Sequence, residues 1–218
     1  MLRRVMPLPI NRIVAAAIAL LVTAVIVVAI IFGAGNRQLA TASRSVVGRD
    51  SYCRGFAADT AVSAVTQPQR GRYANPVYGY AVTIPNGRAG FAPAGAPARG
   101  IVIPLANQPH ALLRVDAAYD ALYDITAAGV HTSDRVDVQL FDRLLSDQAQ
   151  PFSLGGIQGG RYRMQVLCRG ASRPYEFESI IVIRKREIYR LDLQTQTDRL
   201  RQDESLLEAM AGSWSWIP

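Results

Sequence analysis

The most apolar stretch of the chain is a run of 20 residues at positions 13–32 that contains no charge, proline or glycine. Thirteen of its residues are Ile, Leu, Val or Phe, six are Ala and one is Thr23. A helix of this length is about 30 Å long, which matches the hydrocarbon core of a bilayer. The pattern therefore predicts a transmembrane helix over 13–32.

Arginines on either side of this run indicate its orientation. Three arginines precede it within residues 1–12, whereas Arg37 and Arg44 follow it at a short distance. Because positively charged residues that flank a membrane helix stay on the cytoplasmic side, residues 1–12 are expected in the cytoplasm. The sequence thus predicts a single-pass signal-anchor protein of the inner or plasma membrane. Its C-terminal domain is expected in the periplasm or an equivalent extracytoplasmic space.

A cleaved signal peptide is the alternative to an uncleaved anchor. The apolar region of a signal peptide usually spans about 7–15 residues, which is shorter than this run. The nearest Ala-x-Ala pattern, at 40–42, also lies well beyond the end of the run. Both observations favour the anchor, and in either case the domain is exported.

Residues 33–73 lack a clear hydrophobic period and are rich in Ala, Ser, Thr, Gly and Arg, so they are expected to form a tether. Residues 74–218 carry the patterns of a folded domain. Apolar residues there alternate with polar ones, which is typical of half-buried strands. The strands are predicted over 78–85, 100–105, 111–116, 161–168, 175–183 and 188–195, the last two forming a hairpin about 184–187.

Two segments have helical spacing instead. Apolar residues recur at three- and four-residue steps over 134–147 and again near the C-terminus over 203–211. In the second segment, Ser205 and Glu208 have the spacing of a capping box. A few helices together with hairpin-connected strands predict the α+β class, with an antiparallel sheet that packs one face on helices.

Alternation also assigns faces to the strands. Met164 and Leu191 are expected on the inner face of the sheet, towards the helices. The outer face is expected to carry charges from neighbouring strands, namely Arg161, Arg163 and Arg190 with Glu176, Glu178 and Asp192. Cross-strand ion pairs are one interpretation of this surface, and a binding face for an acidic partner or for anionic lipid headgroups is the other.

The chain has two cysteines, Cys53 and Cys168. Both lie outside the membrane in the predicted topology, and cysteines in an oxidising compartment commonly pair, so a disulfide between them is expected. Two unpaired thiols, with Cys168 as a small buried hydrophobic residue, are the alternative. Without a Cys-x-x-Cys motif, a redox role is not expected.

Residues with catalytic or metal-binding chemistry are few. His110 and His131 are the only histidines of the sequence, and neither lies beside a nucleophile motif, so surface positions are expected for both. Asp116, Asp120 and Asp124 recur every four residues. Without a glycine-containing calcium loop, they indicate a solvated face rather than a cation site. No cofactor, metal ion or catalytic residue is therefore predicted.

Charge and the remaining motifs argue against a nucleic-acid-binding protein and against a phosphate-binding loop. The formal net charge is +7, yet only one basic residue is a lysine, and a domain outside the cytoplasm is not expected to bind nucleic acid. The glycines at 155–160 lack the lysine and the spacing of a phosphate-binding loop and precede a strand, which favours a turn. Core packing is expected for Trp214 and Trp216, with one under the last helix and the other able to be exposed, and docking of a partner on a terminal aromatic is the alternative.

Some of these patterns resemble a known family. The residues concerned are the strand opening at 78–85, the glycine turn from Phe152 to Tyr162, Ile188-Tyr189-Arg190-Leu191, and the closing Ser213-Trp214-Ser215-Trp216. Over residues 75–216 the chain is similar to the PsbP/DcrB-like superfamily, which includes uncharacterised bacterial envelope proteins. The resemblance implies a central antiparallel sheet of about six strands flanked by helices, no common active site, and an accessory or binding role.

The sequence thus predicts a membrane-anchored extracytoplasmic module of the cell envelope that is not an enzyme and acts by binding. Another envelope protein is the expected partner. Two alternatives stay open. One is a secreted hydrolase whose site is assembled from scattered residues such as His110, His131 and Asp116. The other is a structural subunit of a membrane or secretion assembly.

Overall fold

The computed structural model describes residue 53 and residues 67–93, 96–105, 111–120 and 125–218. The chain divides into two compact units, Met1–Gly48 and Arg49–Pro218, and every described residue belongs to the second. The predicted transmembrane helix at 13–32 lies outside the described residues. Within the part that is described, none of the helices is long and apolar enough to cross a membrane.

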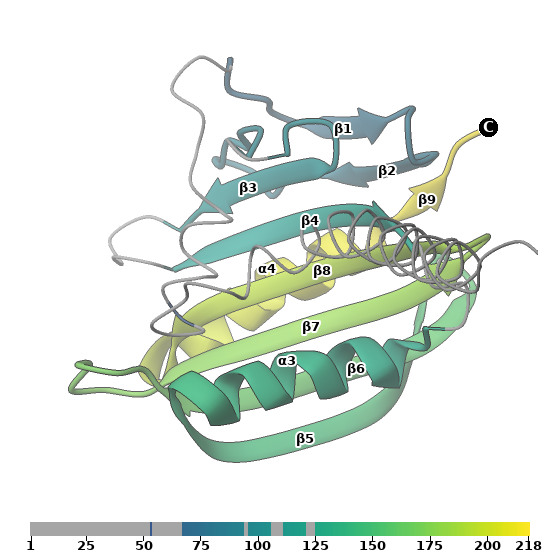
Figure 1. The fold of residues 1–218 in the computed structure, drawn as a ribbon. Coiled ribbons are helices and arrows are strands. Elements are labelled where there is room, and N and C mark those ends of the chain that lie inside the picture. The colour runs from purple at the N-terminus through teal and green to yellow at the C-terminus, as the bar shows by residue number, and fades with distance from the viewer. Residues whose placement is uncertain (1–52, 54–66, 94–95, 106–110, 121–124) are drawn as a thin grey trace, which may run out of the picture. The chain divides into compact units, whose positions relative to one another are not determined.

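The centre of the domain is an antiparallel sheet of six strands in the order β3-β4-β8-β7-β6-β5 (Figure 1). Its strands are β3 (Gly100–Pro104), β4 (Leu112–Tyr119), β5 (Arg143–Leu154), β6 (Ile157–Leu167), β7 (Tyr175–Arg184) and β8 (Glu187–Gln196). Strands β5 to β8 follow one another through short connections, so neighbours in sequence are also neighbours in the sheet. The predicted antiparallel sheet of about six strands is therefore confirmed.

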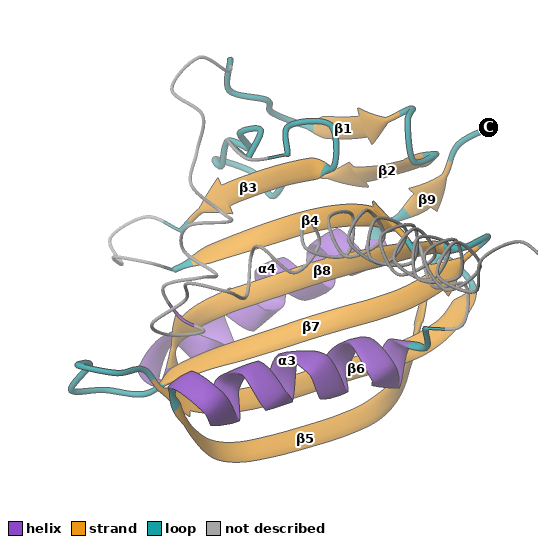
Figure 2. Cartoon of the chain, viewed as in Figure 1, coloured by secondary structure: helices purple, strands orange, loops and turns teal. Residues whose placement is uncertain are grey.

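Two helices cover opposite faces of this sheet (Figure 2). α3 (Ala127–Phe141) lies against β5, β6 and β7, and α4 (Leu200–Gly212) packs against β8 on the other side. A 3-10 turn, η1 (Thr197–Arg199), leads from β8 into α4. The α+β class is confirmed, but helices cover both faces of the sheet rather than one, so the middle strands bury side chains in both directions.

A second, smaller sheet joins the two ends of the domain. Its order is β1-β2-β9, with antiparallel strands β1 (Arg72–Asn75), β2 (Tyr80–Thr83) and β9 (Ser215–Trp216). Trp214, just before β9, stacks on Tyr80 with ring centroids 4.7 Å apart. This contact confirms the core position predicted for Trp214. β1 begins inside the stretch that was expected to be a tether.

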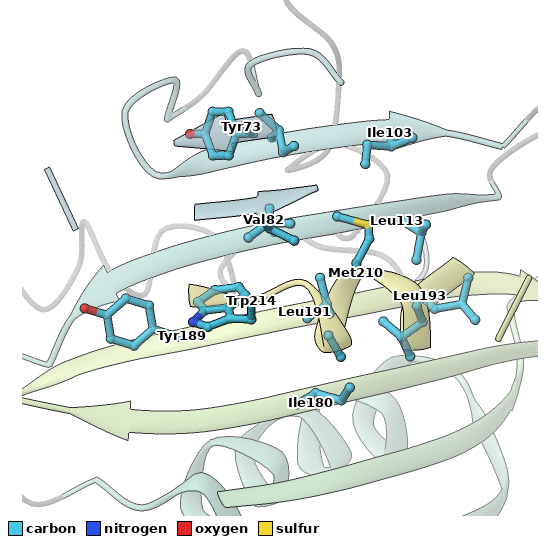
Figure 3. Packing of buried hydrophobic residues seen from close by; sticks show 14 of the residues in the cluster. Tyr73, Val82, Ile103, Leu113, Ile180, Tyr189, Leu191, Leu193, Met210 and Trp214 are labelled. Atoms are coloured by element: carbon cyan, nitrogen blue, oxygen red, sulfur yellow. The ribbon is translucent and has the colours of Figure 1, made fainter. Parts of the chain in front are cut away.

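The larger hydrophobic core lies between the six-stranded sheet and α4. Met210 of α4 packs in one buried cluster with Leu113, Leu191 and Leu193 (Figure 3). On the opposite face, Met164 of β6 belongs to a second cluster together with Val138 of α3. Burying one such side chain stabilises the fold by about 1.5–3 kcal/mol, so both helices are held mainly by apolar contact.

Met164 and Leu191 are both buried, but they face opposite sides of the sheet, so the single inner face predicted for them is wrong. Met164 pairs with Phe177, whereas Leu191 pairs with Ile180. Directly paired residues share a face, and residues an odd number of positions apart on one strand point to opposite faces. Alternation orders the faces within one strand, but the phase between strands depends on the pairing register.

The helix predicted over 134–147 is displaced, because α3 ends at Phe141 and a strand follows. At the start of α3, the Thr126 hydroxyl accepts a hydrogen bond from the backbone N–H of Gly129 at 3.0 Å, which caps the helix. β5 is an edge strand whose residues are mostly exposed, so it lacks the apolar alternation that marks a strand in sequence. Its pairing with β6 determines its conformation.

α4 begins earlier than predicted. Its first residue is Leu200, and Arg199 at the cap position makes no side-chain cap bond. Ser205 therefore lies inside the helix, where its hydroxyl donates to the carbonyl of Gln202 at 2.7 Å. The predicted capping box is wrong, because the preceding 3-10 turn runs directly into the helix.

Candidate functional site

The predicted disulfide is present. Cys53 and Cys168 are bonded, their Cα atoms lie 5.9 Å apart, and both residues are buried. Asp142, at the C-terminal end of α3, contacts the backbone on both sides of this bond. Its carboxylate accepts hydrogen bonds from the backbone N–H of Cys53 at 3.3 Å and of Arg169 at 2.7 Å. Cys53 is therefore fixed at the C-terminal end of α3.

Arg161 and Arg163, predicted to lie on a charged face, do share a face, and it is the one covered by α4. Arg163 lies 2.8 Å from the buried Glu178 of β7, and Arg161 also contacts that carboxylate. Each arginine lies 2.5 Å from Glu204 of α4, and Arg161 lies 3.2 Å from Glu208. The Arg161 side chain is only 10% exposed, so both arginines form structural ion pairs rather than an open binding face.

Arg190 does not join them, and the predicted shared face is wrong for this residue. It pairs with Ile181, whereas Arg161 pairs with the adjacent Ile180, so the two arginines point to opposite faces of the sheet. On its own side, Arg190 lies 2.7 Å from Asp134 of α3. The sequence shows the alternation of each strand, but not that these two strands are one residue out of phase.

Asp192 is the centre of a buried charge cluster on the α3 side of the sheet. Arg114 lies 2.6 Å from it and Arg190 3.2 Å, and the Ser179 hydroxyl donates to it at 2.6 Å. Burial alone would raise the pKa of Asp192, but the two arginines and the hydroxyl favour the charged form more strongly, so its pKa lies below the ordinary value. These groups neutralise one another inside the domain.

Burial affects the charges near α4 in the same way. It opposes the charged form of Arg161 and Arg163, but contact with Glu178 outweighs this, so the pKa of each arginine is raised. Glu176 is different, because burial raises its pKa against the hydrogen bonds from Gln165 and Thr197. The charged side chains on the α4 side of the sheet thus have ion-pair or hydrogen-bond partners inside the domain.

His131 is buried, so the surface position predicted for it is wrong. Its Nε2 atom lies 2.9 Å from a carboxylate oxygen of Asp147 on β5, and its ring stacks on that of Tyr162 with centroids 4.3 Å apart. His131 therefore bonds to Asp147 and not to Asp116. His110 lies outside the described residues. The residues of the hydrolase alternative are not brought together in the described part of the chain.

Asp116, Asp120 and Asp124 were expected on a solvated face, and this expectation is wrong for the two that the structure describes. Asp116 and Asp120 are both buried. Asp116 lies 2.5 Å from Arg99, and the Asp120 carboxylate accepts the backbone N–H of Ile125 at 3.2 Å. Asp124 lies outside the described residues. Among those that are described, no group of three or more His, Cys, Asp or Glu residues is placed to hold a metal ion.

A shallow hollow of about 450 Å³ lies at the N-terminal end of α3 and is open to solvent. Its described lining consists of Ile125, Thr126, Ala127, Ala128, Gln158, Gly159, Tyr162 and Ile183. The Thr126 hydroxyl already caps α3, and burial raises the pKa of the Tyr162 phenol, which keeps it protonated. The hollow thus offers mainly apolar contact, together with the Tyr162 phenol and the Gln158 amide.

The helical partners of the buried polar groups were not predicted from the sequence. Glu204 and Asp134 hold arginines of the sheet, and the buried Asp203 accepts a hydrogen bond from the Thr195 hydroxyl at 2.5 Å. A single carboxylate in a helix normally indicates a solvated position. One signal was available, because Asp203 and the fully buried Leu207 are four residues apart and so lie on the same side of the helix.

Comparison with known proteins gives matches only at the level of structure. No family model matches the chain, and no curated protein matches it. Among solved structures, PsbP (CyanoP) from the cyanobacterium Synechocystis is 21% identical, with 72% of this chain and 97% of that chain covered and a TM-score of 0.45. The resemblance predicted from the sequence is thus matched by a solved PsbP structure.

Two further solved structures are similar. LpqN of Mycobacterium tuberculosis, a protein involved in cell envelope biogenesis, is 14% identical, with 76% of this chain and 96% of that chain covered and a TM-score of 0.44. The Ran-binding protein Mog1p of Saccharomyces cerevisiae is 10% identical, with 69% and 97% covered and a TM-score of 0.43. At these identities the likeness concerns the fold, and it assigns no site residue or partner.

Proposed function

We propose that the chain is a membrane-anchored module of the cell envelope whose folded domain lies outside the cytoplasm. It acts by binding another envelope protein rather than by catalysis. The observation that carries this proposal is the buried disulfide between Cys53 and Cys168. Disulfides persist in oxidising compartments and are rare in the cytosol, so the bond supports export. The apolar run at 13–32, with arginines before it, supports the anchor.

The contacts inside the domain support the non-catalytic part of this proposal. Arg161, Arg163 and Arg190 are each held by carboxylates, so the most prominent charges of the sheet stabilise the fold. His131 is held between Asp147 and the ring of Tyr162, and it lies behind that lining residue of the hollow rather than in the lining itself. LpqN, one of the solved structures that this chain matches, is involved in cell envelope biogenesis.

Membrane fractionation tests anchoring and export together. The full chain is expressed in a bacterial host, the membranes are washed with carbonate, and the pellet is analysed without reducing agent. We expect the chain in the pellet, with protease digestion from the extracytoplasmic side and a Cys53–Cys168 peptide in mass spectrometry. A Val22→Arg, Ile26→Arg variant is the control, because each arginine at the centre of a membrane helix costs about 2.5–3.5 kcal/mol of insertion free energy.

Different failures point to different parts of the proposal. A soluble mature form that begins near Ser43 would contradict the anchor and favour a cleaved signal peptide, while export would stand. Two thiols that react with an alkylating agent after unfolding, without prior reduction, would contradict export to an oxidising compartment. A stoichiometric complex in a detergent pull-down would favour the structural subunit of a larger assembly over a transient binding module.

A further inference from the structure

The hollow at the N-terminal end of α3 contains a buried phenol that has no partner. Tyr162 of β6 lines the hollow and is only 8% exposed, yet its hydroxyl makes no hydrogen bond to any described residue. Burial alone raises its pKa, without a contribution from a hydrogen bond or a nearby charge. Other buried phenols are bonded, because Tyr80 donates to the carbonyl of Arg99 and Tyr189 to that of Tyr78. A buried hydroxyl normally has such a partner, so the Tyr162 phenol is free to bond to a molecule in the hollow.

The strand itself directs this phenol towards the hollow. Gly160 lies two residues before Tyr162 on the same face of β6, and a Cβ added at Gly160 would overlap the Tyr162 hydroxyl. The ring therefore lies along β6 over Gly160, next to Gln158 and Gly159, which also line the hollow. His131 stacks on the ring with centroids 4.3 Å apart. The hydroxyl is thus held in place before any ligand binds.

The first turn of α3 adds two backbone donors to the same hollow. The carbonyl and hydroxyl of Thr126 accept the N–H groups of Val130 and Gly129, each at 3.0 Å. The N–H groups of Ala127 and Ala128 have no partner among the described residues, and both alanines line the hollow. The first turn has no acidic residue that would compensate the partial positive charge of the helix end. These two donors and the phenol therefore border one solvent-filled space.

The remainder of the described lining is mainly apolar. Ile125 and Ile183 supply its large aliphatic side chains, and the volume of about 450 Å³ is in the range of small-molecule sites. Two carboxylates bond to residues beside the hollow, but neither belongs to its lining. Asp120 accepts the backbone N–H of Ile125, and Asp147 bonds to His131. The hollow thus combines apolar contact with hydrogen-bond donors that have no acceptor.

We propose that this hollow binds a small organic carboxylate with a compact apolar body. The carboxylate accepts hydrogen bonds from the N–H groups of Ala127 and Ala128 and from the Tyr162 hydroxyl, while the apolar body packs on Ile125 and Ile183. A carboxylate only accepts hydrogen bonds, and a helix N-terminus favours negative charge, so this headgroup matches the free donors. Binding of a small molecule goes beyond the function proposed above. It does not depend on the anchor, because every residue involved lies in the folded domain.

Titration of the full-length chain in phosphatidylcholine nanodiscs tests the site, with the NMR shifts of the backbone amides as the readout. The probe is cyclohexanecarboxylate, which should give saturable shifts at Ala127 and Ala128. Cyclohexanecarboxamide keeps the shape without the charge, and acetate keeps the charge without the ring. Each should bind at least about tenfold more weakly, since hydrogen bonds to a charged group and burial of an apolar ring each contribute that factor or more.

Matched variants identify the groups responsible. Tyr162→Phe should weaken binding of the acid about tenfold. It should not lower the thermal unfolding midpoint, because the lost hydroxyl has no partner in the domain. Ala128→Asp should abolish binding, since its carboxylate repels the probe and competes for the same donors, although an acidic residue suits the first turn of a helix. Tyr175→Phe is the control, because Tyr175 lies at the other end of β7 from Ile183, and it should leave the affinity unchanged.

Each contrary result overturns a specific part of the inference. If the acid gives no saturable shifts, the hollow is not a ligand site. Equal binding of the amide would overturn recognition of the charge, and unchanged affinity in Tyr162→Phe would overturn the role of the phenol. Tighter binding of the peptide acetyl-Ala-Ala-Leu, which ends in the same carboxylate, would assign the hollow to a protein C-terminus instead of a small molecule. A chain that binds the acid but leaves the membrane in a carbonate wash would contradict only the anchor.

Discussion

Lys185 and Arg186 form the two-residue turn between β7 and β8 with positive φ angles of 48° and 69°. A side chain makes this left-handed conformation unfavourable, and Asn-Gly is the preferred pair in such turns. Lys185→Asn with Arg186→Gly is therefore expected to raise the free energy of unfolding by about 1 kcal/mol. Urea denaturation of the full chain in detergent micelles measures this gain.

The turn between β5 and β6 supplies the matched control. It already has two glycines, Gly155 and Gly156, with φ angles of 55° and 79°. A Cβ added at Gly156 meets no atom within 4 Å, so Gly156→Ala tests the backbone conformation alone. We expect it to lower the free energy of unfolding by about 1 kcal/mol. A gain at this position would contradict the account of both turns.

Met164 and Leu191 test the two layers of the core separately. Met164 is 3% exposed on the α3 side of the sheet, and Leu191 is fully buried on the α4 side. Replacing either by alanine should cost about 2–5 kcal/mol of unfolding free energy. Because the two side chains share no cluster, the double variant should show the sum of the single losses. Leu140→Ala is the exposed control, and a loss there as large as at Leu191 would contradict the assigned burial.

At the level of elements, strong alternation was enough to predict the β7–β8 hairpin. The predicted strands at 175–183 and 188–195 lie within one residue of β7 and β8 at every boundary. These strands are rich in Ile, Leu and Val, so their period is visible without a partner. The disulfide was also predictable, because the compartment and the number of cysteines leave few alternatives.

The errors come from elements whose conformation depends on a neighbour. β5 has mostly polar, exposed residues, and only pairing with β6 makes it a strand, so its leucines appeared to continue the preceding helix. The prediction that Arg190 shares a face with Arg161 and Arg163 was wrong because the sequence of a single strand does not determine the pairing register between β6, β7 and β8. The partners on α3 and α4 were missed because helix docking brings them to the sheet.

The cluster around Asp192 tests how the sheet depends on its internal charges. Asp192 is 1% exposed and holds both Arg114 and Arg190. Asp192→Asn keeps the shape but removes the charge that compensates two buried guanidinium groups, so we expect a loss of about 3–5 kcal/mol of unfolding free energy. Asp198→Asn is the control, because Asp198 is exposed and lies 3.9 Å from an exposed arginine. Its effect should be below about 1 kcal/mol.

The same cluster predicts sensitivity to acid. Although burial opposes its charge, Arg190 and Arg114 keep the pKa of Asp192 below the ordinary value. A carboxylate with a lower pKa in the folded state adds stability above its unfolded pKa of about 3.9 and loses that contribution as the pH falls towards the folded pKa. At pH values below about 4, the urea concentration at the unfolding midpoint should therefore decrease. The decrease should be smaller in the Asp192→Asn variant than in the unchanged chain. Parallel pH profiles for the two proteins would contradict this assignment.

At the scale of the whole molecule, the domain keeps most of its notable charges inside. Glu178 on the α4 side and Asp192 on the α3 side are almost completely buried, and each is held by two arginines. The hollow at α3 is mainly apolar in comparison. Contacts with other molecules are therefore expected to depend on exposed aliphatic groups rather than on the arginines of the sheet.

The disulfide links this domain to the chain that precedes it, and its removal is the last prediction. Cys53 and Cys168 are 115 residues apart. In the chain-entropy model, closing a loop of this size stabilises the folded state by about 4–5 kcal/mol, and removal of a native disulfide typically costs about 2–5 kcal/mol. Cys53→Ala with Cys168→Ala should lower the free energy of unfolding by such an amount. Reduction of the unchanged chain should give the same urea midpoint as the double variant. Equal midpoints with and without the bond would contradict its structural role.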